Sequence, residues 1–214
     1  DSRLSAAGES LTGVHGAVDF IESFKLSAVD LQSVRHAVVI GGGNTAIDVV
    51  RELKGLNVPE VTLIYRRDEA SMSGYIHEWK AAKVEGVRSS WRTQPLEFIG
   101  EGGVLQGIRC VHLDENRAPI DGSEHILMTD LALLAIGQSK QGQLLDALEG
   151  VEIEWGRIVV DDDGCTGRAG YFAGGDCANG GKEVVNAVAE GKRSALAIHK
   201  YLSEGESLRG GQNG

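Results

Sequence analysis

The segment VVIGGGNTAIDVV, residues 38–50, constrains the fold more than any other part of the chain. A short apolar run ends in three glycines, and apolar residues then recur at helical spacing. A buried strand, a glycine turn and a helix in this order are the opening of a Rossmann-type βαβ unit. The next apolar run, VTLIY at residues 61–65, arrives where the second strand of such a unit is expected. We therefore predict an α/β fold with a parallel sheet.

The glycine turn in this segment has the pattern of a dinucleotide site, Gly41-x-Gly43-x-x-Ala46. We expect Gly41 to permit the tight turn, Gly43 to let the backbone approach a pyrophosphate, and small Ala46 to let the helix pack closely on the strand. The N–H groups of Asn44 and Thr45 would then point at phosphate oxygens, and the helix dipole would add to the attraction. The alternative is a glycine turn with a purely structural role.

Two arginines follow the second strand of this unit. Many such units place an acidic residue there, which accepts hydrogen bonds from a ribose hydroxyl. Arg66 and Arg67 reverse that choice in a chain whose formal net charge is -10 at pH 7. A fork of N–H donors suits a phosphate dianion, and a guanidinium can stack on adenine, so the pair favours NADP(H) over NAD(H). The alternative is a solvated strand end, in which Arg67 merely pairs with Asp68 or Glu69.

A third motif, GYFAGGDCANGGKEVVNAVAEGK, occupies residues 170–192. We expect a strand that ends at Gly175 and Asp176, and a glycine-rich loop that leads into a helix whose N-terminal amides begin near Val184 and Val185. Asp176 is suited to accept hydrogen bonds from sugar-type hydroxyls. An aspartate in a glycine-rich turn is often only a turn residue, and the residue pattern alone leaves both roles open.

The remaining periodicities predict the other elements of the fold. They are helices near residues 16–26, 74–86 and 183–201, an antiparallel meander of short strands from residue 87, a buried strand in DLALLAIG at residues 130–137, and a frayed tail from about residue 203. In the first of these helices, Val18, Ile21 and Phe24 fall on one face.

Charge and cysteine spacing exclude several classes of protein. The acidic balance argues against nonspecific nucleic-acid binding, which needs a basic surface. No apolar run approaches the ~20 residues that span a bilayer, and DSRLSAAGES lacks the apolar segment of a signal peptide, so we expect a cytoplasmic protein without membrane contact. Cys110, Cys165 and Cys177 form no C-x-x-C, so the sequence encodes no zinc ribbon, iron–sulfur run or dithiol centre. The histidines lack the spacing of metal ligands, and we expect no metal site.

Four motifs together resemble one family along nearly the whole chain. In order, they are VVIGGGNTAIDVVRELKG, VTLIYRRDEASMSG, DLALLAIGQ and GRIVVDDDGCTGRAGYFAGGDCANGGKEVVNAVAEGKRSA. Their order and spacing resemble the small (beta) subunit of NADPH-dependent glutamate synthase and its relatives among dihydropyrimidine dehydrogenases and other FAD-dependent oxidoreductases. The resemblance implies a Rossmann-like NADPH-binding domain, with a parallel sheet, helices and an antiparallel meander, followed by the C-terminal part of an FAD-binding domain.

The resemblance also implies limits for these domains, because in this family the NADPH domain is inserted into a discontinuous FAD domain. Residues 1–34 would be the connector from the first FAD half, residues 35–136 the NAD(P)H-binding domain, and residues 137–214 the C-terminal segment of the FAD domain. Ile136 and Gly137 would mark the return crossing, close to the nicotinamide of NADPH.

Four further positions match the second FAD motif of the family. Gly175 and Asp176 match the turn whose carboxylate holds the ribityl chain. The amides of Val184 and Val185 match those that face the pyrimidine edge of the flavin. By resemblance, these four residues would bind FAD.

The sequence departs from the family in two places. The N-terminal G-x-G-x-x-G unit of the FAD domain and the cysteine-rich iron–sulfur segment that precedes it are missing. The chain therefore looks like a fragment, and we expect it to hold FAD only if the missing half is supplied. At residues 72–74 the chain has Met-Ser-Gly where the family has Met-Pro and a small residue, and we expect Ser73 to loosen that loop.

The resemblance implies an NADPH-dependent FAD oxidoreductase, in which a hydride passes from NADPH to the flavin and the protein supplies position and electrostatics. No catalytic acid, base or nucleophile is needed, and the fragment alone is expected to be inactive. Electrons would leave through an iron–sulfur segment or a partner subunit. The alternatives are an oxidoreductase of dihydropyrimidine dehydrogenase type, a ferredoxin-linked NAD(P)H oxidoreductase subunit, and a module that binds NADP(H) without redox chemistry. The motif around Asp176 favours an enzyme, because a sensor needs no flavin half-site.

Overall fold

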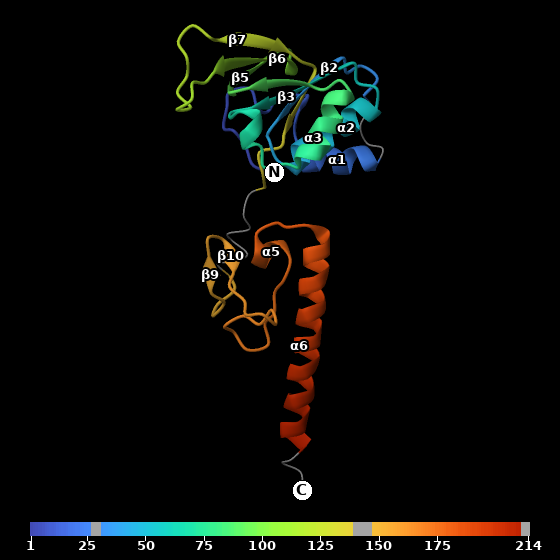
Figure 1. Cartoon of the computed structure of the whole chain (residues 1–214), viewed down its shortest axis with the longest axis vertical. Helices are drawn as coiled ribbons and strands as arrows, with labels where there is room; N and C mark the ends of the chain where they lie inside the picture. The colour runs from blue at the N-terminus through green and yellow to red at the C-terminus, as the bar shows by residue number, and fades with distance from the viewer. Residues whose placement is uncertain (27–30, 139–146, 211–214) are drawn as a thin grey trace. The chain divides into compact units, whose positions relative to one another are not determined.

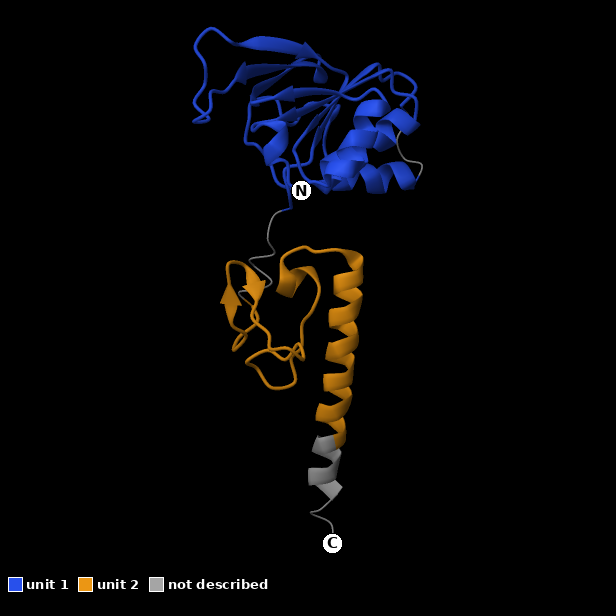
Figure 2. Ribbon diagram, viewed as in Figure 1, with its two compact units in different colours: residues 1–139 blue, residues 140–214 orange. Residues whose placement is uncertain are grey.

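The computed structural model describes residues 1–26, 31–138 and 147–210, with side chains as far as residue 203. The chain forms two compact units, Asp1–Ser139 and Lys140–Gly214 (Figure 2). We call them the N-terminal unit and the C-terminal unit. The strands and helices of the glycine-turn motif all fall in the N-terminal unit (Figure 1).

A five-stranded parallel sheet is the centre of the N-terminal unit. Its strands are β1 (Val14–Gly16), β2 (His36–Ile40), β3 (Glu60–Tyr65), β4 (Arg88–Trp91) and β8 (Leu131–Leu134). They lie in the order β1-β8-β2-β3-β4, and every neighbouring pair is parallel. Each residue of β8 is buried, as expected for a strand inside a parallel sheet. Because all five strands run the same way, their carboxyl ends meet at one edge.

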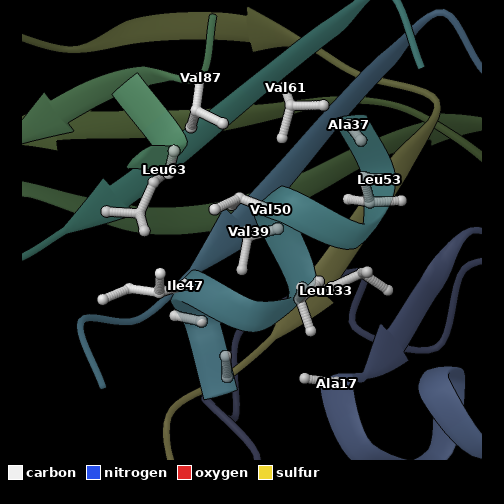
Figure 3. Packing of buried hydrophobic residues seen from close by; sticks show 14 of the residues in the cluster. Ala17, Ala37, Val39, Ile47, Val50, Leu53, Val61, Leu63, Val87 and Leu133 are labelled. Atoms are coloured by element: carbon white, nitrogen blue, oxygen red, sulfur yellow. The ribbon is translucent and has the colours of Figure 1, made fainter. Parts of the chain in front are cut away.

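Three helices cover one face of this sheet: α1 (Ala17–Lys25), α2 (Asn44–Gly55) and α3 (Ile76–Val84). The apolar residues that recur at helical spacing in α2 are all buried: Ala46, Ile47, Val50 and Leu53. Figure 3 shows the core between the layers, in which Ile47, Val50 and Leu53 of α2 lie over Val39, Leu63 and Leu133 of the sheet. Burial of each such side chain contributes roughly 1.5–3 kcal/mol, which holds the start of α2 firmly against the sheet.

An antiparallel sheet covers the other face. It consists of β5 (Thr93–Glu101), β6 (Val104–His112) and β7 (His125–Met128), in that spatial order. Phe98, Ile108 and Cys110 of this sheet belong to a second buried cluster with residues of β2, β3 and β8. Burial raises the pKa of the Cys110 thiol to about 12, so this cysteine is an inert part of the core.

The described residues of the C-terminal unit form a two-stranded ribbon and two helices: β9 (Ile153–Glu154), β10 (Arg157–Ile158), α5 (Asp176–Asn179) and α6 (Val184–Gly210). The strand expected in GYFAGGD does not form, and Phe172 makes one isolated bridge, to Cys165. A strand needs a neighbour along its length, and no other strand in the described residues pairs with this segment. The backbone of α6 is helical as far as Gly210, and the fraying expected from about residue 203 stays a prediction. No helix in the described part of the chain is both long and apolar enough to cross a membrane.

Three details of the N-terminal unit differ from the sequence-based expectation. β4 joins the parallel sheet beside β3, although we expected it to begin the antiparallel meander. β1 was not predicted, because three residues are too short to show a period. Of the three residues predicted to share one face of α1, Ile21 and Phe24 pack against the core, whereas Val18 is 37% exposed. Ala17 and Phe20 are the residues of α1 that are fully buried there.

Candidate functional site

The glycine turn lies at the carboxyl edge of the parallel sheet, between β2 and α2. The N–H of Gly41 donates to Ile64 O at 3.0 Å, so the turn begins while the chain is still bonded to β3. Gly41 has a φ of +152°, and a Cβ at this position would lie 2.2 Å from Ala135 O. The close approach of the residue after β8 therefore requires glycine here.

The next two glycines differ in what surrounds them. A Cβ on Gly42 would lie 2.4 Å from the ring of Tyr65, which packs against the turn. Gly43 has a φ of -95° and a ψ of -178°, a conformation open to any residue. Of the described residues, only Ser73, with Oγ at 3.6 Å, lies near the Cβ that Gly43 lacks. The fold does not need glycine at position 43, and the open space suits the approach of a pyrophosphate.

The start of α2 carries N–H donors that the protein does not use. Helical bonding begins with the N–H groups of Ala46 and Ile47, which donate to Gly43 O at 3.1 and 3.3 Å. Within the described residues, the N–H groups of Asn44 and Thr45 have no acceptor, as expected in the first turn of a helix. Two open donors at the positive end of a 12-residue helix suit a phosphate group.

Residues 72–75 cross the start of α2 and are tied to it. Ser73 donates to Gly42 O from its N–H at 3.0 Å and from its Oγ at 3.4 Å, and the N–H of Gly74 donates to the same oxygen at 3.1 Å. Asn44 Oδ1 accepts from the N–H of Tyr75 at 2.8 Å. A proline at position 73 would lack both of the donors that Ser73 supplies, the N–H and the hydroxyl. The expectation that Ser73 loosens the loop is therefore wrong, because the serine fastens it to the glycine turn.

Ile136 and Gly137 follow β8 at the same edge of the sheet. They come directly after Ala135, the residue that approaches Gly41. Ile136 is 37% exposed, and Gly137 has a φ of +105°. Gly137 O accepts from the N–H of Ser2 at 2.9 Å. Both residues thus directly follow the residue that contacts Gly41, and their position near a nicotinamide stays a prediction.

Arg66 and Arg67, which we call the arginine pair, follow β3 at this edge and are both exposed. Within the described residues, neither guanidinium makes a hydrogen bond or an ion pair. Asp68 and Glu69, the acids expected to pair with Arg67 if it were only part of a solvated strand end, have other partners. The arginine pair is therefore available to an anionic ligand.

The C-terminal unit holds the four residues assigned to FAD by resemblance. Gly175 has a φ of +72° and precedes α5, and Asp176 is the first residue of that helix, with an exposed side chain. Val184 and Val185 open α6 and are 80% and 65% exposed. Helical bonding there starts two residues later, so their N–H groups lie at the positive end of a long helix.

Glu190 of α6 holds the turn before Asp176 and was missed by the sequence reading. Its Oε2 accepts from the N–H of Gly175 at 2.7 Å and from Asn179 Nδ2 at 2.8 Å. The hydrogen bond from Gly175 is the main reason why the pKa of the Glu190 carboxyl is lowered. Nothing in the sequence marks this acid, because its role depends on how α6 packs on the turn.

Glu190→Gln should reduce the stability of the C-terminal unit near neutral pH and much less in acid. A carboxyl whose pKa is lowered by folding stabilises the protein above its unfolded pKa, and the contribution disappears as the pH falls through the lowered value. Urea unfolding of the whole chain, near pH 7 and below about pH 4, measures the difference between the variant and the natural protein. Glu154→Gln, on the exposed ribbon, is the control. An equal difference at both pH values would contradict the assigned role.

The parallel sheet, the glycine turn with its open amides and the arginine pair define a Rossmann-type dinucleotide-binding protein. The chain belongs to the pyridine nucleotide-disulphide oxidoreductase family, whose sequence model matches residues 2–191. A pyridine nucleotide and FAD are the cofactors of this family, in agreement with the cofactors predicted from the sequence.

Curated relatives support the predicted resemblance. The chain is 35% identical over 217 residues to the beta subunit of NADP(+)-dependent formate dehydrogenase from Moorella thermoacetica, covering 95% of this chain and 30% of that protein. It is 32% identical over 222 residues to the small chain of glutamate synthase [NADPH] from Azospirillum brasilense, covering 92% of this chain and 46% of that protein. The corresponding Escherichia coli small chain is 36% identical over 183 residues, covering 78% of this chain and 39% of that protein. The chain thus spans less than half the length of these relatives.

Solved structures confirm the fold class. Thioredoxin reductase from T. acidophilum matches with a TM-score of 0.76 at 23% identity, covering 95% of this chain and 62% of that one. An FAD-dependent pyridine nucleotide-disulphide oxidoreductase from Desulfovibrio vulgaris matches with a TM-score of 0.67 at 20% identity, covering 93% and 51%. At these identities the likeness concerns the fold alone. All three cysteines of this chain are free thiols.

Proposed function

We propose that this chain is the NADPH-binding portion of a flavin-dependent oxidoreductase that passes a hydride from NADPH to FAD, of the glutamate synthase small-chain type. The observation that carries the proposal is the arginine pair, exposed and without a hydrogen-bond or ion-pair partner in the described part of the chain, at the carboxyl end of the strand next to the glycine turn. An acid at this place would repel a 2′-phosphate, whereas two guanidinium groups bind it.

Different residues of the N-terminal unit bind different parts of NADPH in this proposal. The amides of Asn44 and Thr45 bind the pyrophosphate, and the space beside Gly43 lets it approach. The arginine pair binds the 2′-phosphate. Ile136 and Gly137 lie beside the turn and border the nicotinamide. When both cofactors are bound, they supply the redox chemistry, and the protein contributes position and electrostatics.

The C-terminal unit supplies part of an FAD site in this proposal. Asp176 accepts hydrogen bonds from the ribityl hydroxyls, and the amides of Val184 and Val185 stabilise negative charge on the flavin ring. Residues 1–34 connect from a first FAD half, residues 35–136 bind NADPH, and residues 137–214 complete the FAD domain. β1 and α1 pack on the same sheet as β2, so the connector contributes to the core that positions the glycine turn.

A partner subunit or an iron–sulfur segment accepts the electrons in this proposal. Relatives of the chain are named as subunits of a formate dehydrogenase and as small chains of glutamate synthase, and each name implies an assembly with other subunits. No three histidine, cysteine or acidic side chains among the described residues are grouped to hold a metal ion. The electron acceptor is therefore expected outside these residues.

The flavin spectrum tests this function. The protein is purified with whatever sequence its gene encodes ahead of Asp1, and its visible absorbance is recorded without oxygen before and after addition of NADPH. We expect bound flavin whose absorbance bleaches with NADPH, and we expect residues 1–214 alone to retain little FAD. A flavin that dithionite bleaches and NADPH does not would contradict hydride transfer, and stoichiometric FAD on residues 1–214 as a monomer would contradict the divided FAD site.

A further inference from the structure

Two carboxylates stand directly after the arginine pair, in the sequence Arg66-Arg67-Asp68-Glu69. A carboxylate that pairs with a guanidinium neutralises it, and it also repels a phosphate dianion that approaches. If these two carboxylates paired with the arginines, the arginine pair could not bind a 2′-phosphate. The structure shows each carboxylate bound to a different element instead.

Glu69 is held by two residues of α3. It is the first residue of the 3-10 helix η1 (Glu69–Ser71), and its Oε1 accepts from Trp79 Nε1 at 2.9 Å. Lys83 Nζ contacts the same oxygen at 2.5 Å. Trp79 and Lys83 are four residues apart, so they share one face of the helix, and the indole of Trp79 is fully buried. The bond from Lys83 is the main reason why the pKa of Glu69 is lowered, so the carboxylate remains ionised and held.

Asp68 is held from the other side. Its Oδ1 accepts from the N–H and the Oγ of Ser71, at 2.9 and 2.6 Å, and these bonds are the main cause of its lowered pKa. Its Oδ2 lies 3.6 Å from Arg92 Nη2. Arg92 follows β4 with a φ of +47°, which is unusual for a residue with a side chain, and its N–H donates to Arg67 O at 2.9 Å. Arg92 thus contacts the segment after β3 twice, with its backbone N–H at Arg67 and with its side chain at Asp68.

We propose that Lys83, Trp79 and Arg92 are positioning residues for nucleotide specificity, which hold Glu69 and Asp68 so that the arginine pair stays available to the 2′-phosphate. This inference rests on the proposed NADPH site and assigns its selectivity to residues that do not touch the nucleotide. Stability does not explain the ion pair between Lys83 and Glu69. Lys83 and Glu69 are 43% and 38% exposed, and ion pairs of this kind contribute about 0–1 kcal/mol to folding.

Lys83→Met tests the proposal, because methionine keeps the length and the helix propensity of lysine without its charge. The Glu69 carboxylate, which then keeps only its neutral bond from Trp79 Nε1, competes for the arginine pair. We expect the dissociation constant of NADPH to rise roughly three- to tenfold, as one charge interaction at a partly exposed site predicts, while that of NADH changes by less than about twofold. Titration of the whole chain with each nucleotide measures both constants.

Arg88→Met is the matched control. Arg88 Nη1 lies 2.7 Å from Glu60 Oε2. Arg88 is the first residue of β4 and Glu60 is the first residue of β3, so the pair lies at the opposite end of these strands from the arginine pair. This variant removes one positive charge and one surface ion pair, as Lys83→Met does. We expect it to leave the affinities for both nucleotides unchanged, because no carboxylate is freed beside the site.

Two combined variants distinguish pairing of Glu69 with the arginines from a general change in the electrostatic potential at the site. Lys83→Met with Glu69→Gln should restore the natural preference for NADPH, because no carboxylate is left to compete. Lys83→Met added to a chain that already carries Arg66→Ala and Arg67→Ala should have no further effect. The proposal is overturned if Lys83→Met leaves the preference unchanged in a chain that discriminates NADPH from NADH. It is also overturned if Lys83→Met raises the dissociation constant of NADPH by the same factor with and without the arginine pair. If the unaltered chain does not discriminate, the proposed NADPH site itself fails.

Discussion

Replacement of Gly43 by alanine should weaken the binding of NADPH and of NADH alike, with no loss of folding stability. Alanine adopts the φ and ψ of Gly43 without strain, and among the described residues its Cβ would meet only Ser73 Oγ, at 3.6 Å. The same methyl group would stand where a pyrophosphate approaches the amides of Asn44 and Thr45. Each charge-assisted hydrogen bond lost costs roughly 1.5–3 kcal/mol, or about 10- to 100-fold in affinity, so the loss of both predicts at least about 100-fold.

Two other glycines of the same strand–turn–helix segment, Gly55 and Gly41, serve as matched controls. At the exposed end of α2, the Cβ of Gly55→Ala meets no atom of the described residues within 4 Å, so this variant should be neutral or slightly stabilising. Gly41→Ala forces a Cβ against Ala135 O, so it should lower the free energy of unfolding by about 1–3 kcal/mol. Urea unfolding of the three variants measures the loss of folding stability, and nucleotide titration measures the loss of affinity for NADPH and NADH. If Gly43→Ala bound both nucleotides normally, the glycine turn would have only a structural role.

The sequence contains enough information to predict the dinucleotide unit. β2, α2 and β3 lie where the apolar run, the helical spacing and the second apolar run placed them. This segment is predictable because each element is specified by its own residues: the strands by buried aliphatic side chains, the helix by its buried face, and the turn by glycines. The resemblance to known oxidoreductases added a predicted order of the domains, which periodicity alone does not contain and which stays a prediction.

The missed features depend on contacts between segments that are distant in the sequence. β1 is an edge strand of three residues, and it is specified by its pairing with β8. β4 joins the parallel sheet because it pairs with β3, while its own residues fit a meander equally well. Ser73 and Glu190 each act through a bond to a glycine backbone group on another element. A single sequence shows which side chains can form such bonds, and the fold decides which ones do.

Replacement of both Arg66 and Arg67 by alanine should remove the preference for NADPH over NADH. Each charge-assisted hydrogen bond to the 2′-phosphate is worth roughly 1.5–3 kcal/mol, which corresponds to about 10- to 100-fold in affinity per contact. The dissociation constant of NADH should change little, because the glycine turn and its amides lie on a different segment. Both side chains are exposed and without partners among the described residues, so the variant should fold as the natural chain does. Paired titrations with NADPH and NADH, on the natural chain and on the double variant, measure the effect.

Salt provides an independent check on the same pair. The additional attraction for NADPH is electrostatic and partly exposed, so added salt should weaken NADPH binding more than NADH binding in the natural chain. In the double variant the two salt dependences should coincide. Equal affinities for the two nucleotides in the natural chain would mean that the arginine pair is only a solvated strand end. A parallel loss for both nucleotides in the double variant would instead show that these arginines support the second strand of the βαβ unit, and selectivity for the 2′-phosphate would then have to come from another part of the chain.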